Sequence, residues 1–187
     1  NDGMGLVHGI DYCYTVVAFF ADGSESYPSN EACATLKKDV PIITNVSVTE
    51  TSTTQGEIFV AWSKPTDMDT LIFGGPYKYV INRADSENPQ FTQITENLGI
   101  NDTLFMDGPG LNTADLKYSY KIDMYSLDGG SQTFIGSTQV ARSMFLNITP
   151  TDQALQLSWN IEAPWINYRY TIYRLNTQTE MFDSIGL

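Results

Sequence analysis

Short runs in which apolar and polar residues alternate occupy most of this chain. In the run from Glu57 to Ser63, the apolar residues Ile58, Val60 and Trp62 fall on every second position. This is the spacing of a strand that buries one face. No segment keeps apolar residues at helical spacing over three turns, so we expect very little helix. The pattern predicts an all-β protein.

Between residues 39 and 142, turn-forming residues separate seven such runs. The predicted strands are Ile42–Val48, Glu57–Ser63, Tyr77–Arg83, Phe91–Thr95, Thr103–Met106, Lys117–Leu127 and Thr133–Ala141. The fifth should end in an Asp-Gly-Pro-Gly corner at residues 107–110, and the last two should form a hairpin around residues 128–130. Seven strands at this spacing suit a two-sheet sandwich.

The segments on either side repeat parts of this pattern. Asp2-Gly3-Met4-Gly5-Leu6 recurs as Asp107-Gly108-Pro109-Gly110-Leu111, and the copies lead into Tyr12-Cys13-Tyr14 and Tyr118-Ser119-Tyr120. Val60-Ala61-Trp62 and Tyr79–Arg83 return as Leu157-Ser158-Trp159 and Tyr170–Arg174. The flanking strands are expected at Tyr12–Phe20, Ala32–Leu36, Phe145–Ile148, Leu155–Trp159, Tyr168–Arg174 and near Phe182.

The repeats divide the chain into three modules of one kind. Residues 1–38 are the C-terminal part of a module, 39–142 a complete module, and 143–187 the N-terminal part of a third. Alone, each partial module would expose an apolar, unpaired sheet. We therefore expect its missing strands to lie in further chain or in another polypeptide.

These residues resemble fibronectin type III modules, which have an immunoglobulin-like sandwich fold. The resemblance assigns Trp62 and Trp159 as core tryptophans of the second strand. It assigns Tyr12 and Tyr118 as corner tyrosines whose hydroxyl bonds the backbone a few residues upstream. The spacing from Leu6 to Tyr12 fits the family, whereas that from Leu111 to Tyr118 is one residue longer. The implied architecture is a tandem array of β-sandwiches, one complete and two partial.

A narrower resemblance is to modules of Bacteroidetes surface proteins linked to gliding motility and type IX secretion. It is carried by the Gly5–Tyr14 run, the hairpin Ala21–Ser26 and the strand Tyr168–Arg174. This resemblance implies an exported protein at the cell surface or outside the cell. Its expected partners are other domains of the same chain, and secretion-machinery proteins, surface proteins or glycans.

Composition and charge exclude some classes of binding partner. The formal net charge is −12 and the pI about 4.2, with 42% hydrophobic residues. An acidic surface repels phosphate backbones and anionic lipid, which argues against nucleic-acid binding. No apolar run has the length needed to cross a bilayer, so we expect no membrane insertion.

Cys13 and Cys33 are the only cysteines. If residues 20–26 form a hairpin that turns at Gly23, these two positions face each other across the strands, close enough for a disulfide. Because Tyr12 and Tyr14 should point into the core, the bridge would lie on the outer face. The alternative is a pair of free thiols in a cytosolic protein.

Other side chains offer little chemistry. The best groupings of carboxylates contain Asp67, Asp69, Asp102 and Asp107. These residues lack the spacing of a calcium-binding loop, so we expect them to be solvated loop residues. The single histidine, His8, belongs to a different module from most serines, which argues against a catalytic triad. We expect no metal, no cofactor and no enzymatic activity.

Two kinds of glycosylation signal are present. Asn45, Asn101 and Asn147 fit the eukaryotic acceptor pattern, which a bacterial origin would leave unused. The bacterial group that the chain resembles carries O-linked sugars where Asp-Ser or Asp-Thr precedes an apolar residue. Thr70, Thr103 and Ser184 have that context.

The expected function is non-catalytic: a spacer or adhesion region of a large secreted or cell-surface bacterial protein. One alternative is a glycan- or protein-binding module, which would use the loop from Lys64 to Pro76 or the loop aromatic residue Trp165. Another alternative is an accessory region of a secreted glycan-degrading enzyme.

Overall fold

The computed structural model describes residues 11–35, 40–66, 68–160 and 162–186. Within these ranges the chain is all-β, and one 3₁₀ turn, η1 (Asp128–Gly130), is the only helical segment. The expectation of an all-β protein with very little helix is confirmed. The same residues contain no helix long and apolar enough to span a membrane.

In the part of the chain that the structure describes, fourteen strands form small antiparallel sheets. They are β1 (Asp11–Tyr14), β2 (Ala32–Thr35), β3 (Ile42–Glu50), β4 (Gly56–Ser63), β5 (Tyr77–Asp85), β6 (Thr92–Leu98), β7 (Leu104–Leu111), β8 (Tyr118–Ser126), β9 (Thr133–Ser137), β10 (Ala141–Arg142), β11 (Phe145–Thr151), β12 (Ala154–Asn160), β13 (Ile172–Asn176) and β14 (Met181–Gly186).

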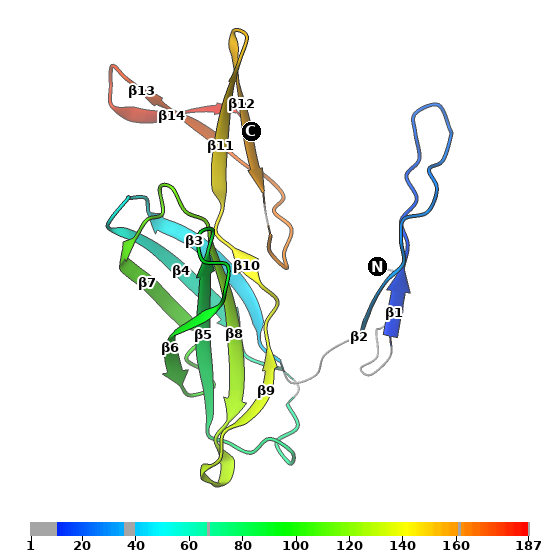
Figure 1. Cartoon of the computed structure of the whole chain (residues 1–187), viewed down its shortest axis with the longest axis vertical. Helices are drawn as coiled ribbons and strands as arrows, with labels where there is room; N and C mark the ends of the chain where they lie inside the picture. Colours follow the sequence, from blue (N-terminus) through cyan, green and yellow to red (C-terminus); the bar gives the residue numbers. More distant parts are fainter. Residues whose placement is uncertain (1–10, 36–39, 67, 161, 187) are drawn as a thin grey trace.

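The middle of the chain builds two facing sheets (Figure 1). One has the order β3-β4-β7, and the other has the order β10-β8-β5-β6 with β9 also paired to β8. The predicted strand Thr133–Ala141 is thus divided into β9 and β10. Between them, the Thr138 hydroxyl accepts a hydrogen bond from the Ile122 N–H at 3.1 Å. The arrangement is consistent with a β-sandwich.

Alternation along the strands fills the space between these sheets. Core side chains with at most 3% exposure are Ile43, Ile58, Val60, Trp62, Tyr79, Ile81, Tyr120, Ile122, Met124 and Ala141. Trp62 and Tyr79 meet edge to face, with ring centroids 5.4 Å apart. The Trp62 Nε1 is buried and has no hydrogen-bond partner among the described residues.

A buried polar network links the two sheets. Arg83 of β5 donates to both carboxylate oxygens of Asp107 of β7, at 3.0 and 2.8 Å. Tyr120 of β8 donates its hydroxyl to the same carboxylate at 2.7 Å. Burial lowers the pKa of Arg83, but hydrogen bonding and attraction to Asp107 outweigh this and raise the pKa. Both sheets therefore share one charged contact.

The sequence predicted a corner at residues 107–110, but the structure has no corner there. β7 continues through these residues to Leu111, bulging between the pairs Ile58–Asp107 and Gly56–Leu111. At Gly108, where φ is +128°, a Cβ would lie 2.7 Å from the Gly56 carbonyl oxygen, so glycine is required. The chain turns only after Leu111.

The tyrosine at this corner makes the bond that the fibronectin resemblance implies. The Asn112 N–H donates to the Tyr118 hydroxyl oxygen at 3.1 Å. Asn112 also accepts a hydrogen bond from the Asp115 N–H at 3.1 Å, which closes the turn between β7 and β8.

The flanking segments form separate hairpins (Figure 1). Among the described strands, β1 pairs only with β2, β11 with β12, and β13 with β14. The predicted strand Tyr12–Phe20 ends early, at Tyr14. Beyond it, serine hydroxyls enter the ladder: the Val16 N–H donates to Ser29 Oγ at 3.0 Å and the Ala18 N–H to Ser26 Oγ at 2.9 Å.

The Arg83–Asp107 contact yields a stability prediction. Asp107→Asn removes the negative charge and leaves Arg83 without a counter-charge, so we expect a loss of about 3 kcal/mol, the lower end for a buried pair. Urea unfolding followed by circular dichroism measures it. The control Glu96→Gln removes the same charge from the more exposed Lys78–Glu96 pair and should cost no more than about 1 kcal/mol. Equal losses in the two variants would contradict the assignment.

Tyr79 predicts an alkaline limit to stability. Its hydroxyl donates to the Ile100 carbonyl at 3.0 Å, and burial raises its pKa to about 12, against about 10 for an unfolded tyrosine. The neutral phenol therefore stabilises the fold fully below about pH 10, and this contribution is lost as pH rises toward 12. Thermal unfolding temperatures across that range should fall steeply for the wild type and less steeply for Tyr79→Phe.

Candidate functional site

The junction between the middle segment (residues 40–142) and the third segment (residues 143–186) is the best-formed candidate site. The Arg142 N–H donates to the Glu162 carbonyl at 2.7 Å, and the two side chains form an ion pair at 2.6 Å. Trp165, from the same loop as Glu162, packs against the core cluster of the middle segment. Two hydrogen-bonded or charged contacts and one aromatic contact thus join the segments.

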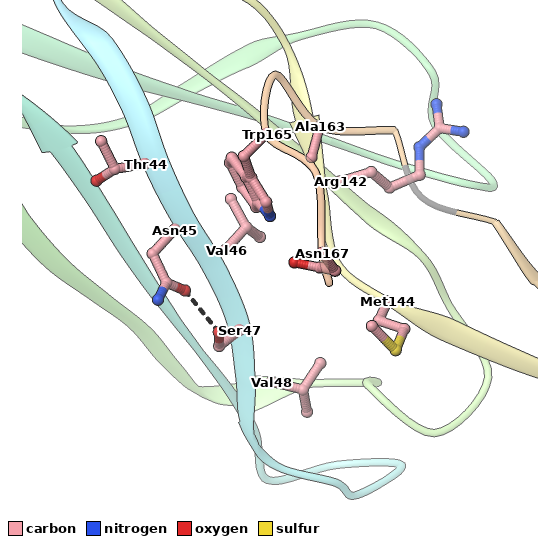
Figure 2. A pocket seen from close by; sticks show the side chains of 10 residues that line it. All are labelled: Thr44, Asn45, Val46, Ser47, Val48, Arg142, Met144, Ala163, Trp165 and Asn167. Carbon is pink, nitrogen blue, oxygen red and sulfur yellow. Dashed lines mark hydrogen bonds between the residues drawn. The ribbon is translucent and has the colours of Figure 1, made fainter. Parts of the chain in front are cut away.

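A groove of about 360 Å³ lies beside this junction (Figure 2). Its lining residues are Thr44, Asn45, Val46, Ser47, Val48, Arg142, Met144, Ala163, Trp165 and Asn167. Figure 2 shows the Trp165 ring directed toward β3, close to Val46. This lining contains no carboxylate, thiol or imidazole. The groove can therefore bind through amides, hydroxyls and one ring, but it offers no acid–base pair.

Trp165 is half-buried, whereas its neighbour Ile166 is 86% exposed. The sequence singled out Trp165 as a contact residue for a glycan or a partner protein. In the structure its ring contacts the same chain, between the third segment and β3. Trp165 is also one of the residues that line the groove.

The two predicted core tryptophans differ in burial. Trp62 is 3% exposed, whereas Trp159 is half-buried. Trp159 lies 5.4 Å from Tyr170 between ring centroids, the distance also found between Trp62 and Tyr79. The repeated sequence thus makes the same aromatic pair twice.

Cys13 and Cys33 form a disulfide and face each other in the β1–β2 register. Both residues are exposed, as expected for the outer face of the hairpin. Tyr14 was expected in a core, but it is 57% exposed because no second sheet covers its face of the hairpin. Tyr12 is half-buried.

The candidate acids do not converge on a metal site. Asp69 accepts hydrogen bonds from the N–H groups of Leu71 and Ile72, at 3.1 and 3.3 Å, and so shapes its own turn. The expectation that Asp107 is solvated is wrong, because it is buried against Arg83. Asp67 and His8 lie outside the described residues.

Among the residues that the structure describes, the only group of three metal-ligating types is Cys13, Glu31 and Cys33. Both of its sulfur atoms are in the disulfide, so the group has no thiolate to offer.

The three O-glycosylation candidates differ in accessibility. Thr70 is exposed in the loop after β4, and Ser184 is exposed within β14. Thr103 is half-buried, and its carbonyl accepts a hydrogen bond from the Trp62 N–H at 3.0 Å. Thr70 is therefore the candidate that a glycosyltransferase could reach most easily.

Sequence reasoning missed the Arg83–Asp107–Tyr120 network. Its signal was present in the repeats, since Arg83 recurs as Arg174 and Tyr120 recurs as Tyr14. A charged or hydroxyl-bearing residue that recurs within a core-facing pattern indicates a paired buried group.

A scan against protein-family models finds no matching family, and a search of curated proteins finds no match.

The disulfide yields a direct test. We expect the intact mass of the denatured protein to rise by one hydrogen per cysteine on reduction, and unreduced protein to resist thiol alkylation. Cys13→Ser leaves Cys33 unpaired and should make it alkylable without reductant. Alkylation of both cysteines in unreduced wild type would contradict the disulfide.

Proposed function

We propose that this chain is a non-catalytic spacer or adhesion region of a large exported bacterial protein. On this proposal its modules are of the fibronectin type III kind, arranged in tandem, and the parent protein belongs with the surface proteins of gliding motility and type IX secretion. The partners would be neighbouring domains of the same chain, surface or secretion proteins, or glycans.

The junction between the middle and third segments is the observation that carries this proposal. A spacer must resist bending where modules meet as well as within each module. The Arg142–Glu162 ion pair and the packing of Trp165 restrict the junction. Within the middle segment, the Arg83–Asp107 contact ties one sheet to the other.

An exported location is supported by the disulfide. Disulfides persist in oxidising compartments and at cell surfaces, and they are rare in the cytosol. The Cys13–Cys33 bond is exposed, so a reducing cytosol would have access to it. The chain also shows no membrane-spanning helix among its described residues.

A binding role is the second candidate, and the groove beside β3 favours it. The side-chain amides of Asn45 and Asn167 and the ring of Trp165 line the same groove. An aromatic face with neighbouring amides offers stacking and hydrogen bonds to a sugar.

One variant distinguishes the two candidates. Trp165→Ala removes the ring from the junction, so we expect the radius of gyration from small-angle X-ray scattering to rise and the distance distribution to broaden. Ile166→Ala, the exposed neighbouring position, is the matched control and should leave both unchanged.

The same proteins, applied to a glycan array, test the second candidate. Binding by wild type and Ile166→Ala that is lost in Trp165→Ala would favour a sugar-binding module. An unchanged scattering profile in Trp165→Ala would remove the main support for the spacer proposal.

A further inference from the structure

The larger sheet of the middle segment carries a polar cluster on the face that points away from the core. Ile81 of β5 and Ile122 of β8 face each other in the register and lie in the core. The next pair along the same two strands, Asn82 and Lys121, therefore projects from the opposite face. Asn82 and Asp123 are both buried there. A carboxamide, a carboxylate and a lysine amine thus gather on two strands that lie side by side (Figure 1).

The carboxylate of Asp123 joins the amine to the carboxamide. Its Oδ1 lies 3.3 Å from Lys121 Nζ, and its Oδ2 accepts a hydrogen bond from Asn82 Nδ2 at 2.9 Å. The hydroxyl of Ser137, on β9, also donates to Oδ1 and helps to hold the carboxylate in place. One carboxylate therefore contacts an amine nitrogen through one oxygen and an amide nitrogen through the other.

The amine and the carboxamide are within reach of each other. Asn82 and Lys121 are directly opposite, and the Cβ atoms of such a pair lie about 4.5–5.5 Å apart. A lysine side chain is long enough to cross that gap. Asn82 Nδ2 also donates to the backbone carbonyls of Val80 and Lys121, at 3.2 and 3.4 Å. These bonds hold the carboxamide in one orientation on the strand that faces the lysine.

Burial favours the protonation states that a reaction between these groups requires. An amine attacks a carbonyl carbon only when it is neutral. The side chains of Lys121 and Asp123 are 31% and 13% exposed, and Lys121 Nζ lies 5.7 Å from the centre of the Phe91 ring. Loss of water disfavours both charges, so moving a proton from the ammonium to the carboxylate costs less here than in solvent. Asp123 is therefore placed to act as a base toward Lys121.

We propose that Lys121 and Asn82 form an isopeptide cross-link, with Asp123 as the acid–base group. The lone pair of Nζ forms a bond to Asn82 Cγ, and the bond from Cγ to Nδ2 breaks. Asp123 takes a proton from Nζ at Oδ1 and supplies a proton to Nδ2 from Oδ2. The lysine ammonium loses two protons in all, and both go to the leaving nitrogen, which departs as an ammonium ion. No oxidant, reductant or other co-reactant takes part, and each molecule reacts once.

The product is a covalent bond between β5 and β8, which are neighbours inside the larger sheet. It closes a loop that runs from residue 82 to residue 121, and a closed loop lowers the conformational entropy of the unfolded chain. The inference does not rest on the spacer role, and a chain without the cross-link would leave that role untouched.

Mass spectrometry of the full 187-residue chain, reduced and denatured, tests the proposal. We expect the wild type to be lighter than its sequence by one molecule of ammonia. Trypsin should then release a branched peptide in which residues 79–83 are joined to residues 118–142, because it does not cleave after an acylated lysine. Fragmentation of that peptide should place the bond between Asn82 and Lys121.

Two variants and a matched control identify the reacting groups. Lys121→Arg keeps the positive charge, but a guanidinium stays protonated and does not attack a carbonyl carbon, so this variant should have its full sequence mass. Asp123→Asn removes the acid–base group and should also have its full mass. Lys78→Arg changes another lysine of β5, one that pairs with Glu96 at 2.7 Å, and should lose ammonia as the wild type does.

The chain also contains an internal control. Lys64 Nζ donates to Asn101 Oδ1 at 2.8 Å, but both residues are exposed. Solvent keeps that amine charged, so the same digest should contain no cross-link between them.

A wild-type chain that keeps its full sequence mass would overturn the proposal, and this measurement does not depend on how well any variant folds. Ammonia loss that persists in Lys121→Arg would overturn it as well, since the ammonia would then come from another side chain. A cross-link that forms as completely in Asp123→Asn as in the wild type would exclude the carboxylate from the reaction.

Discussion

The structure depends on one constraint: a sheet with an apolar face needs a second layer to cover that face. In the middle segment the β3-β4-β7 sheet and the β10-β8-β5-β6 sheet cover each other. Every buried apolar side chain of the described residues lies between Pro41 and Ala141. The flanking hairpins obey the same sequence pattern without a covering layer, and their apolar side chains stay exposed. The strand pattern alone therefore does not bury a face, and a second sheet is needed as well.

Much of the fold was predictable because strand alternation is local. The period-two pattern located the strands of the middle segment, and a single turn at Gly23 placed Cys13 opposite Cys33. Such features depend only on residues that are neighbours in sequence or across one hairpin. The division of the chain into three fibronectin-like modules remains a prediction from the repeats.

What could not be predicted depends on contacts between distant elements. Glycines at residues 108 and 110 suggested a corner, but the bulge opposite Gly56 lets β7 continue past them. Asp107 looked like a loop acid until Arg83, from another sheet, was placed beside it. The sequence suggested that Trp165 is available to a partner, because the surface on β3 that it contacts lies more than a hundred residues earlier in the chain.

The aromatic pair Trp159–Tyr170 has a consequence for the order in which contacts can form in this part of the chain. The two rings meet within a segment that lacks its covering strands, at the same distance as Trp62 and Tyr79 in the covered core. Only ten residues lie between Trp159 and Tyr170, so closing this loop costs little entropy. The contact between these two rings can therefore form before contacts between more distant parts of the chain.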